Sequence, residues 1–131
     1  MDYSAEVQKA IDLIEDNLYD DIKLKDIAKK SHLSEFYFHR LFHRITGETV
    51  MGYVRKRRLA KAACDLKNTE LTVLDIAVKY QFSCGESFTR AFKKMYGITP
   101  YEYRKSNKVI NLYKKINLFS KHNVFMSMMA A

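Results

Sequence analysis

Two stretches of the sequence, about fifty residues apart, carry side chains that can contact DNA from one face of a helix. Arginine pairs with guanine, and an aromatic ring or a threonine methyl group contacts thymine. Lysine, histidine and hydroxyl groups bind backbone phosphates. We therefore predict one DNA-contacting face on each stretch. The candidate residues are Phe36, His39, Arg40, His43 and Arg44 in the first stretch and Glu86, Thr89, Arg90 and Lys93 in the second.

Each predicted face lies opposite a stripe of apolar residues. In both stretches these residues recur at positions i, i+3, i+4 and i+7, the spacing of one buried helix face. They are Phe38, Leu41, Phe42 and Ile45 in the first and Phe88, Ala91, Phe92 and Met95 in the second. A single charged helix face is more often simply solvated. Its recurrence in a chain of formal charge +8 and pI about 9.5 favours a polyanionic partner.

The two stretches belong to a longer internal repeat. Residues 26–49 are DIAKKSHLSEFYFHRLFHRITGET, and residues 75–100 are DIAVKYQFSCGESFTRAFKKMYGITP. The repeat aligns first at a shift of 49 residues and then at a shift of 50, with 11 identical positions. Each copy holds a short helix, a three-residue turn and a second helix, which is the pattern of a helix-turn-helix. Two copies are too few for a solenoid.

The helical periods predict an all-α fold of about seven helices, with two helix-turn-helix lobes joined by a long central helix. Lobe one is predicted over about residues 5–48, the linking helix over about 50–67 and lobe two over about 72–105, all within a DNA-binding domain of residues 1–106. The expected helices cover about 5–19, 24–31, 35–45, 50–67, 72–80, 84–96 and 99–105.

Local signals predict where these helices begin and end. Capping side chains and capping-box patterns mark the starts, and glycines mark two of the stops. The predicted caps are Ser34, Thr72, Ser83 and Thr99, and the predicted stops are Gly47 and Gly97. His32 and Gln81 stand in the two turns, where glycine would be easiest. Histidine tolerates a left-handed backbone better than most residues, whereas Gln81 fits the turn less well.

The linking helix sets a length scale for the two faces. Its roughly eighteen residues span about 27 Å, whereas helices in successive major grooves on one side of DNA lie about 34 Å apart. We expect bending of the DNA to make up the difference. Five basic residues on this helix either bind phosphates or form a solubilising surface: Arg55, Lys56, Arg57, Arg58 and Lys61.

Length and composition disfavour several other classes of protein. At 131 residues the chain forms one domain or two small lobes, and no apolar run approaches the roughly 18 residues of a membrane span. No signal peptide is visible in MDYSAEV, so a cytoplasmic location is expected. The two cysteines, Cys64 and Cys84, lack metal-ligand spacing and are expected to be reduced thiols. No cofactor is expected.

Alternatives to DNA binding have weaker support. His39 and His43 share a helix face and could bind zinc, but the metalloprotease pattern needs glutamate where Arg40 stands. We therefore expect no metal site and no enzyme.

Cys84 at a helix start is either a thiol of lowered pKa or an inert one. The first helix is acidic, which disfavours a membrane surface, and no strand platform for RNA is visible. A protein-interaction module remains the alternative outside nucleic-acid binding.

Residues 5–105 resemble the DNA-binding domain of the AraC/XylS family of bacterial transcription regulators. The resemblance is carried by LKDIAKKSHLSEFYFHRLFHRITGET, YVRKRRLAKAACDL and TVLDIAVKYQFSCGESFTRAFKKMYGITPYEYRK. It implies seven helices in two lobes, two recognition helices in adjacent major grooves of promoter DNA, and recruitment of RNA polymerase, usually in activation. By position it implies base contacts from Phe36, His39, Arg40, Glu86, Thr89 and Arg90. The turns and Cys84-Gly85 depart from the family pattern, and Gly85 gives up one side-chain contact.

The tail of the chain, residues 107–131, lies outside the resemblance. Its apolar residues at 109–116 are compatible with one more short helix, and its last eight residues, VFMSMMAA, are apolar. We expect either a linker to a further, effector-sensing domain or an added helix on lobe two. A small-molecule effector is expected only if such a domain exists.

Overall fold

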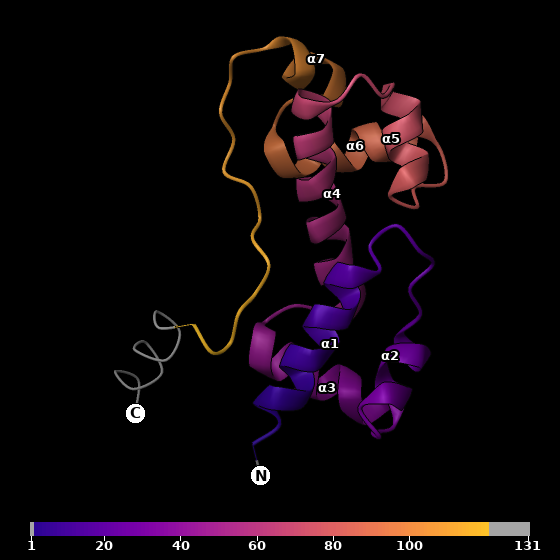
Figure 1. The fold of residues 1–131 in the computed structure, drawn as a ribbon, viewed down its shortest axis with the longest axis vertical. Helices are drawn as coiled ribbons and strands as arrows, with labels where there is room; N and C mark the ends of the chain where they lie inside the picture. The colour runs from indigo at the N-terminus through magenta and orange to yellow at the C-terminus, as the bar shows by residue number, and fades with distance from the viewer. Residues whose placement is uncertain (1, 121–131) are drawn as a thin grey trace. The chain divides into compact units, whose positions relative to one another are not determined.

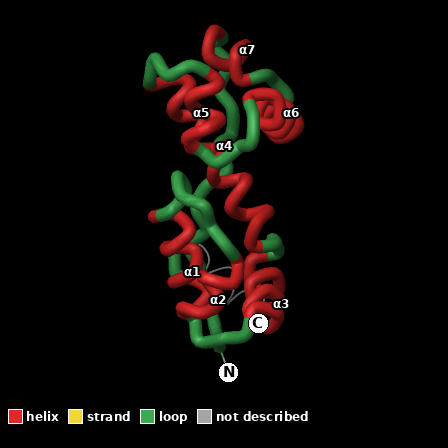
Figure 2. Tube along the Cα trace, turned by 90° about the vertical axis from the view of Figure 1, so that its right-hand side faces the viewer, coloured by secondary structure: helices red, strands yellow, loops and turns green. Residues whose placement is uncertain are grey.

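The structure is a computed structural model that describes residues 2–120. Within these residues it contains helices and no strands (Figure 1, Figure 2). The predicted all-α fold of about seven helices, with two helix-turn-helix lobes and a long central helix, is confirmed. The helices are α1 (Ser4–Asp16), α2 (Leu24–Lys30), α3 (Glu35–Thr46), α4 (Val50–Asn68), α5 (Val73–Lys79), α6 (Gly85–Tyr96) and α7 (Pro100–Lys105).

The described chain divides into two compact units. The first comprises residues 2–16, 22–52 and 115–120, and the second comprises residues 17–21 and 53–114. The helix α4 begins in the first unit and continues in the second. Each unit therefore holds one helix-turn-helix pair, α2 with α3 in the first and α5 with α6 in the second.

The first unit is built on three mutually packed helices. α1 contacts α2 and α3, and α2 contacts α3. Phe38 and Phe42 of α3 are completely buried, with ring centroids 5.9 Å apart. Burial of these two rings turns the opposite side of α3 toward solvent. The partners in this core are Val7, Ala10, Ile11 and Ile14 of α1 and Ile27 and Ala28 of α2.

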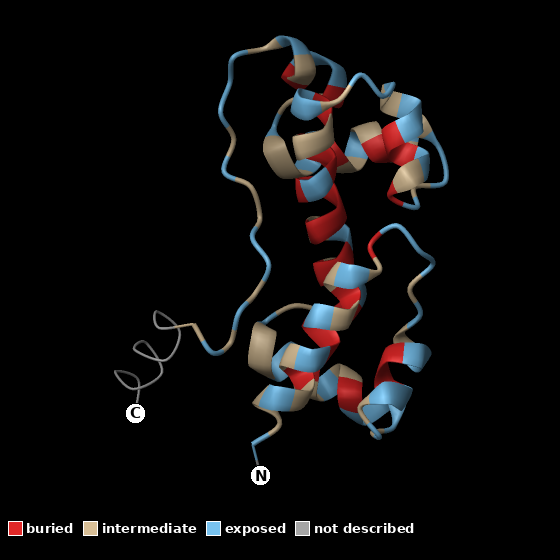
Figure 3. Cartoon of the chain, viewed as in Figure 1, coloured by how far each residue is buried: buried red, intermediate tan, exposed pale blue. Residues whose placement is uncertain are grey.

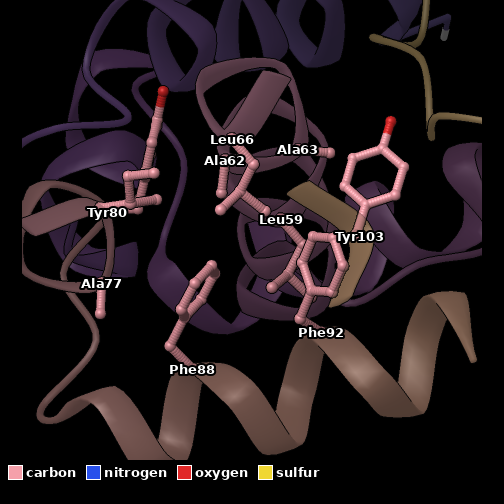
Figure 4. Packing of buried hydrophobic residues seen from close by; sticks show 10 residues of the cluster. Leu59, Ala62, Ala63, Leu66, Ala77, Tyr80, Phe88, Phe92 and Tyr103 are labelled. Atoms are coloured by element: carbon pink, nitrogen blue, oxygen red, sulfur yellow. The ribbon is translucent and has the colours of Figure 1, made fainter. Parts of the chain in front are cut away.

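The second unit buries α6 by the same means. Figure 4 shows Phe88 and Phe92 rising from α6 toward Leu59 and Ala62 of α4. Both rings are completely buried, with centroids 5.8 Å apart. Tyr103 of α7 lies beside Phe92, at a centroid distance of 5.8 Å. The part of α4 in this unit is mostly buried (Figure 3), so it forms the support against which α6 is held.

The two helix-turn-helix turns have the same hydrogen bonds. The N–H of His32 donates to the carbonyl of Lys29 (3.1 Å), and that of Leu33 donates to Ala28 (3.3 Å). Gln81 and Phe82 make the equivalent bonds, at 3.1 and 2.9 Å, 49 residues later. This pair of bonds requires a left-handed residue after the helix.

His32 and Gln81 have φ angles of 59° and 67°, so both adopt this left-handed backbone without being glycine. A left-handed conformation costs a non-glycine residue roughly 1–2 kcal/mol. At Gln81 the side chain offsets part of this cost, because its Nε2 donates to the carbonyl of Tyr19. The glycine stops are also confirmed, with φ of 78° at Gly47 and 76° at Gly97.

Arg57 and Arg58 are buried, each only 8% exposed, and neither forms part of a basic surface. The Arg58 Nε donates to the carbonyl of Leu18 (3.0 Å), and its Nη2 donates to that of Asp20 (2.7 Å). Burial lowers the pKa of Arg58 from its ordinary value. The residues after α1 are thus held on α4 by their carbonyl groups. As a result α1 ends at Asp16, before the predicted end near residue 19.

The described part of the tail is not helical, so the possible helix at 109–116 is wrong. Ile110 and Leu112 pack against the core of the second unit from an extended segment, in which alternate residues face the same way. Arg57 donates to the carbonyl of Tyr113. In the first unit, the Lys115 ammonium pairs with Asp12 at 2.7 Å. The apolar stretch at 124–131 lies outside the described residues.

We expect Arg58→Met to lower the free energy of unfolding by about 1–3 kcal/mol, because it removes both donors and leaves the buried carbonyl of Leu18 without a partner. Methionine retains most of the side-chain volume, so the loss reports the hydrogen bonds rather than a cavity. Urea denaturation followed by circular dichroism measures the change. Arg55→Met is the matched control, since Arg55 is exposed on the same helix. Equal effects of the two substitutions would contradict this role.

Candidate nucleic-acid interface

The candidates of the first stretch lie on α3, and four of the five are exposed. The Phe36 side chain is 71% exposed. The guanidinium of Arg40 lies over this ring, 5.7 Å from its centroid. Arg40 and Phe36 therefore form one surface unit, with a cation stacked on an apolar face. The exposed candidates are Phe36, Arg40, His43 and Arg44.

His39 is placed differently from its neighbours. It is half-buried, and its Nδ1 is buried without a hydrogen-bond partner among residues 2–120. Its ring therefore extends partly into the first unit. Of the five candidates on α3 it is the least accessible to a molecule bound at the surface.

The candidates of the second stretch lie on α6. Glu86, Arg90 and Lys93 are exposed, and Thr89 is half-buried. The Arg90 Nη2 donates to the Glu86 Oε1 at 2.6 Å, and the two side chains are 77% and 78% exposed. Glu86 stands 50 residues after Phe36, and Arg90 stands 50 residues after Arg40. The same helix position is thus aromatic on α3 and acidic on α6.

The start of α6 differs from the prediction. Ser83 is not the N-cap, because the Sγ of Cys84 accepts the hydrogen bond from the Ser87 N–H (3.5 Å). Ser83 instead shares a contact with the Ser87 hydroxyl at 3.4 Å. The other three predicted caps, at Ser34, Thr72 and Thr99, accept hydrogen bonds as expected. Ser83 is the extra residue that changes the repeat shift from 49 to 50.

This change of cap alters what Glu86 can do. With Ser83 as the cap, Glu86 would be the third helical residue, whose carboxylate returns to the cap in a capping box. With Cys84 as the cap, Glu86 is the second residue of α6. Its carboxylate pairs with Arg90, one turn further along. Sequence reasoning missed both pairs on the outward faces, although their i, i+4 spacing was the signal that could have revealed them.

The Cys84 thiol lies at the start of this face and is exposed. Its pKa is lowered from the ordinary value, chiefly by the hydrogen bond from the Ser87 backbone N–H. A thiolate is the reactive form of cysteine, so the lowered pKa makes this exposed thiol reactive at a lower pH than an ordinary thiol.

Only some of the five basic residues in the central part of α4 face solvent. With Arg57 and Arg58 buried, the exposed basic residues of its central part are Arg55 and Lys61. Lys56 is half-buried, with its ammonium 5.3 Å from the centroid of the Tyr113 ring. We therefore narrow the phosphate-binding candidates on this helix to Arg55 and Lys61.

No group of three or more His, Cys, Asp or Glu side chains within residues 2–120 is arranged to hold a metal ion. His39 and His43 therefore belong to no such group in this range. None of the helices in the same range is both long and apolar enough to span a membrane.

Comparison with known proteins agrees with the repeated helix-turn-helix. A family model described as a helix-turn-helix domain matches residues 27–106. The HTH-type transcriptional activator AarP of Providencia stuartii is 43% identical over 94 residues, which cover 72% of this chain and 70% of AarP. The uncharacterized HTH-type transcriptional regulator YbfP of Bacillus subtilis is 47% identical over 104 residues, covering 79% of this chain. The chain spans only 35% of the length of YbfP.

A solved structure also has this fold. It is a Chromobacterium violaceum transcriptional regulator whose description names an AraC-type DNA-binding domain. The two superpose with a TM-score of 0.73 at 26% identity, covering 79% of this chain and 96% of that one. Together with the family model and AarP, this similarity identifies the class as helix-turn-helix transcription regulators. The chain belongs to the AraC/XylS family.

We expect iodoacetamide to alkylate Cys84 faster than Cys64 near neutral pH. Cys84 is exposed and Cys64 is half-buried. Because the pKa of Cys84 is lowered, its thiolate fraction rises at lower pH than that of an ordinary thiol, and the alkylation rate should rise with it. Mass spectrometry of tryptic peptides over a pH series measures both rates. An equal alkylation rate at the two cysteines would contradict the exposure of Cys84 and the lowered pKa of its thiol.

Proposed function

We propose that the chain is a sequence-specific DNA-binding transcription regulator. In this proposal residues 1–106 form the DNA-binding domain, and α3 and α6 enter successive major grooves of promoter DNA. The base-contacting residues are Phe36, Arg40, Glu86, Thr89 and Arg90, with His39 in a lesser role. His43, Arg44 and Lys93 bind phosphates.

The repetition of one geometry at two places is the observation that carries this proposal. Both turns have the same two hydrogen bonds and the same left-handed residue. Both second helices bury a pair of phenylalanines and turn an arginine outward at equivalent positions. A helix presented in this way after such a turn is the element that helix-turn-helix proteins insert in the major groove. The net charge of +8 fits a polyanionic partner.

Activation of transcription is the regulatory mode that we propose, with RNA polymerase as the protein partner. The name of AarP, a transcriptional activator, supports this choice. We propose a cytoplasmic location, where a bacterial promoter lies, and neither enzymatic activity nor a resident cofactor. A small-molecule effector is proposed only if a further domain is present.

We expect Arg40→Ala and Arg90→Ala each to weaken binding to the preferred site by about 1–3 kcal/mol and to relax the preference at one base. The reason is the loss of two hydrogen bonds from a guanidinium to guanine. The preferred site is first selected from a random DNA pool, and affinities are then measured by fluorescence anisotropy. Lys9→Ala, which removes the same charge from α1, is the control.

Salt dependence and protection tests complete the experiment. The logarithm of the affinity should fall with the logarithm of salt concentration, with a slope of about −0.9 per phosphate contact. Nuclease protection should cover two patches of the duplex, about one helical turn apart. An affinity loss that is the same on every sequence would make Arg90 a phosphate contact. Absence of any selected sequence would overturn the proposed function.

A further inference from the structure

The two outward arginines have different partners at equivalent positions. On α3 the guanidinium of Arg40 lies 5.7 Å from the centroid of the Phe36 ring. On α6 the Arg90 Nη2 lies 2.6 Å from the Glu86 Oε1. In both cases the partner is the second residue of its helix, four residues before the arginine. The repeat therefore keeps the arginine and changes the group beside it.

Neither pair is there to stabilise the fold. Phe36 is 71% exposed, and both members of the Glu86–Arg90 pair are more than three-quarters exposed. Exposed ion pairs contribute little to folding stability, because water screens them. What each pair does is restrict the conformations of its arginine before DNA is bound. Such preorganisation lowers the entropic cost of binding.

Phe36 and Glu86 differ in the DNA groups that they can contact. The phenylalanine ring accepts no hydrogen bond, so all five N–H donors of Arg40 remain available to the DNA. The ring also offers an apolar surface, which suits the methyl group of thymine. An ionised glutamate accepts hydrogen bonds and donates none. In the major groove its matching donor is the N4 amino group of cytosine. Adenine also offers a donor, its N6 amino group, but the adjacent N7 is an acceptor that repels a carboxylate, whereas thymine and guanine offer only acceptors at their major-groove edges.

We propose that Phe36 and Glu86 are the specificity-determining residues of the two units, an assignment that rests on the proposed function. Arg40 with Phe36 recognises a guanine beside a thymine. Arg90 with Glu86 recognises a guanine beside a cytosine. Glu86 also acts by exclusion, since a thymine or guanine at the second position places only hydrogen-bond acceptors beside its carboxylate. The two units of one chain thus recognise different base steps through the same backbone geometry.

The test uses the whole chain and the site that it selects from a random DNA pool. The site should contain a guanine beside a thymine and, separately, a guanine beside a cytosine. Replacement of that thymine by deoxyuridine removes only the methyl group. It should weaken binding by the wild-type chain about fourfold, the effect expected for one buried methyl group. Binding by Phe36→Ala should be insensitive to the same replacement.

Glu86→Gln provides the second test. Glutamine keeps the length of the side chain but both donates and accepts, so the preference for cytosine should fall about tenfold. Affinity for the variants of the site that lack this cytosine should rise. Glu70→Gln, which makes the same charge change at an exposed position outside both helix-turn-helix pairs, and Phe119→Ala, which removes an exposed ring from the tail, should match the wild type.

The outcomes separate this assignment from the function on which it rests. Unchanged base preferences in Glu86→Gln, or equal sensitivity of Phe36→Ala and wild type to deoxyuridine, would overturn the assignment while the chain still binds its site. A selected site without these two base steps would also overturn it. If the wild-type chain selects no sequence, the proposed function fails and the assignment fails with it.

Discussion

Burial of a phenylalanine pair fixes the orientation of each outward helix, and the rest of the interface depends on it. Phe38 and Phe42 on α3, and Phe88 and Phe92 on α6, are completely buried. Each ring contributes roughly 1.5–3 kcal/mol when removed from water. Rotation of either helix about its axis would expose two rings at once, so each helix has one stable rotation. The outward position of the arginine on each helix follows directly from that rotation.

Local interactions explain why much of the fold could be predicted from the sequence. The stripes on α3 and α6, the glycine stops and three of the four caps depend on residues within one or two helical turns of each other. The misplaced features depend on distant partners. Arg58 is buried because it binds carbonyls some 40 residues away, and no pattern around it signals that contact. The described tail is extended for the same reason, since Ile110 and Leu112 pack on a core formed by other helices.

The candidate site was predictable in outline but not in its details. The spacing identified which residues of α3 and α6 are outward, yet gave no sign that His39 is partly enclosed. The cap at Cys84 was also missed, because serine is a far more frequent N-cap than cysteine. That single residue of offset decides whether the Glu86 carboxylate closes a capping box or pairs with Arg90.

The two copies of the repeat show which positions are constrained by the fold and which are free. The turn tolerates little variation in geometry, because its two hydrogen bonds close only around a left-handed residue. The buried rings are retained because a smaller side chain would leave a cavity. The side chain of the second residue is largely exposed on both α3 and α6, so an aromatic ring and a carboxylate are both compatible with the fold. Chemistry at this position can therefore change without loss of stability, and a duplicated unit can acquire a different base preference while its scaffold stays the same.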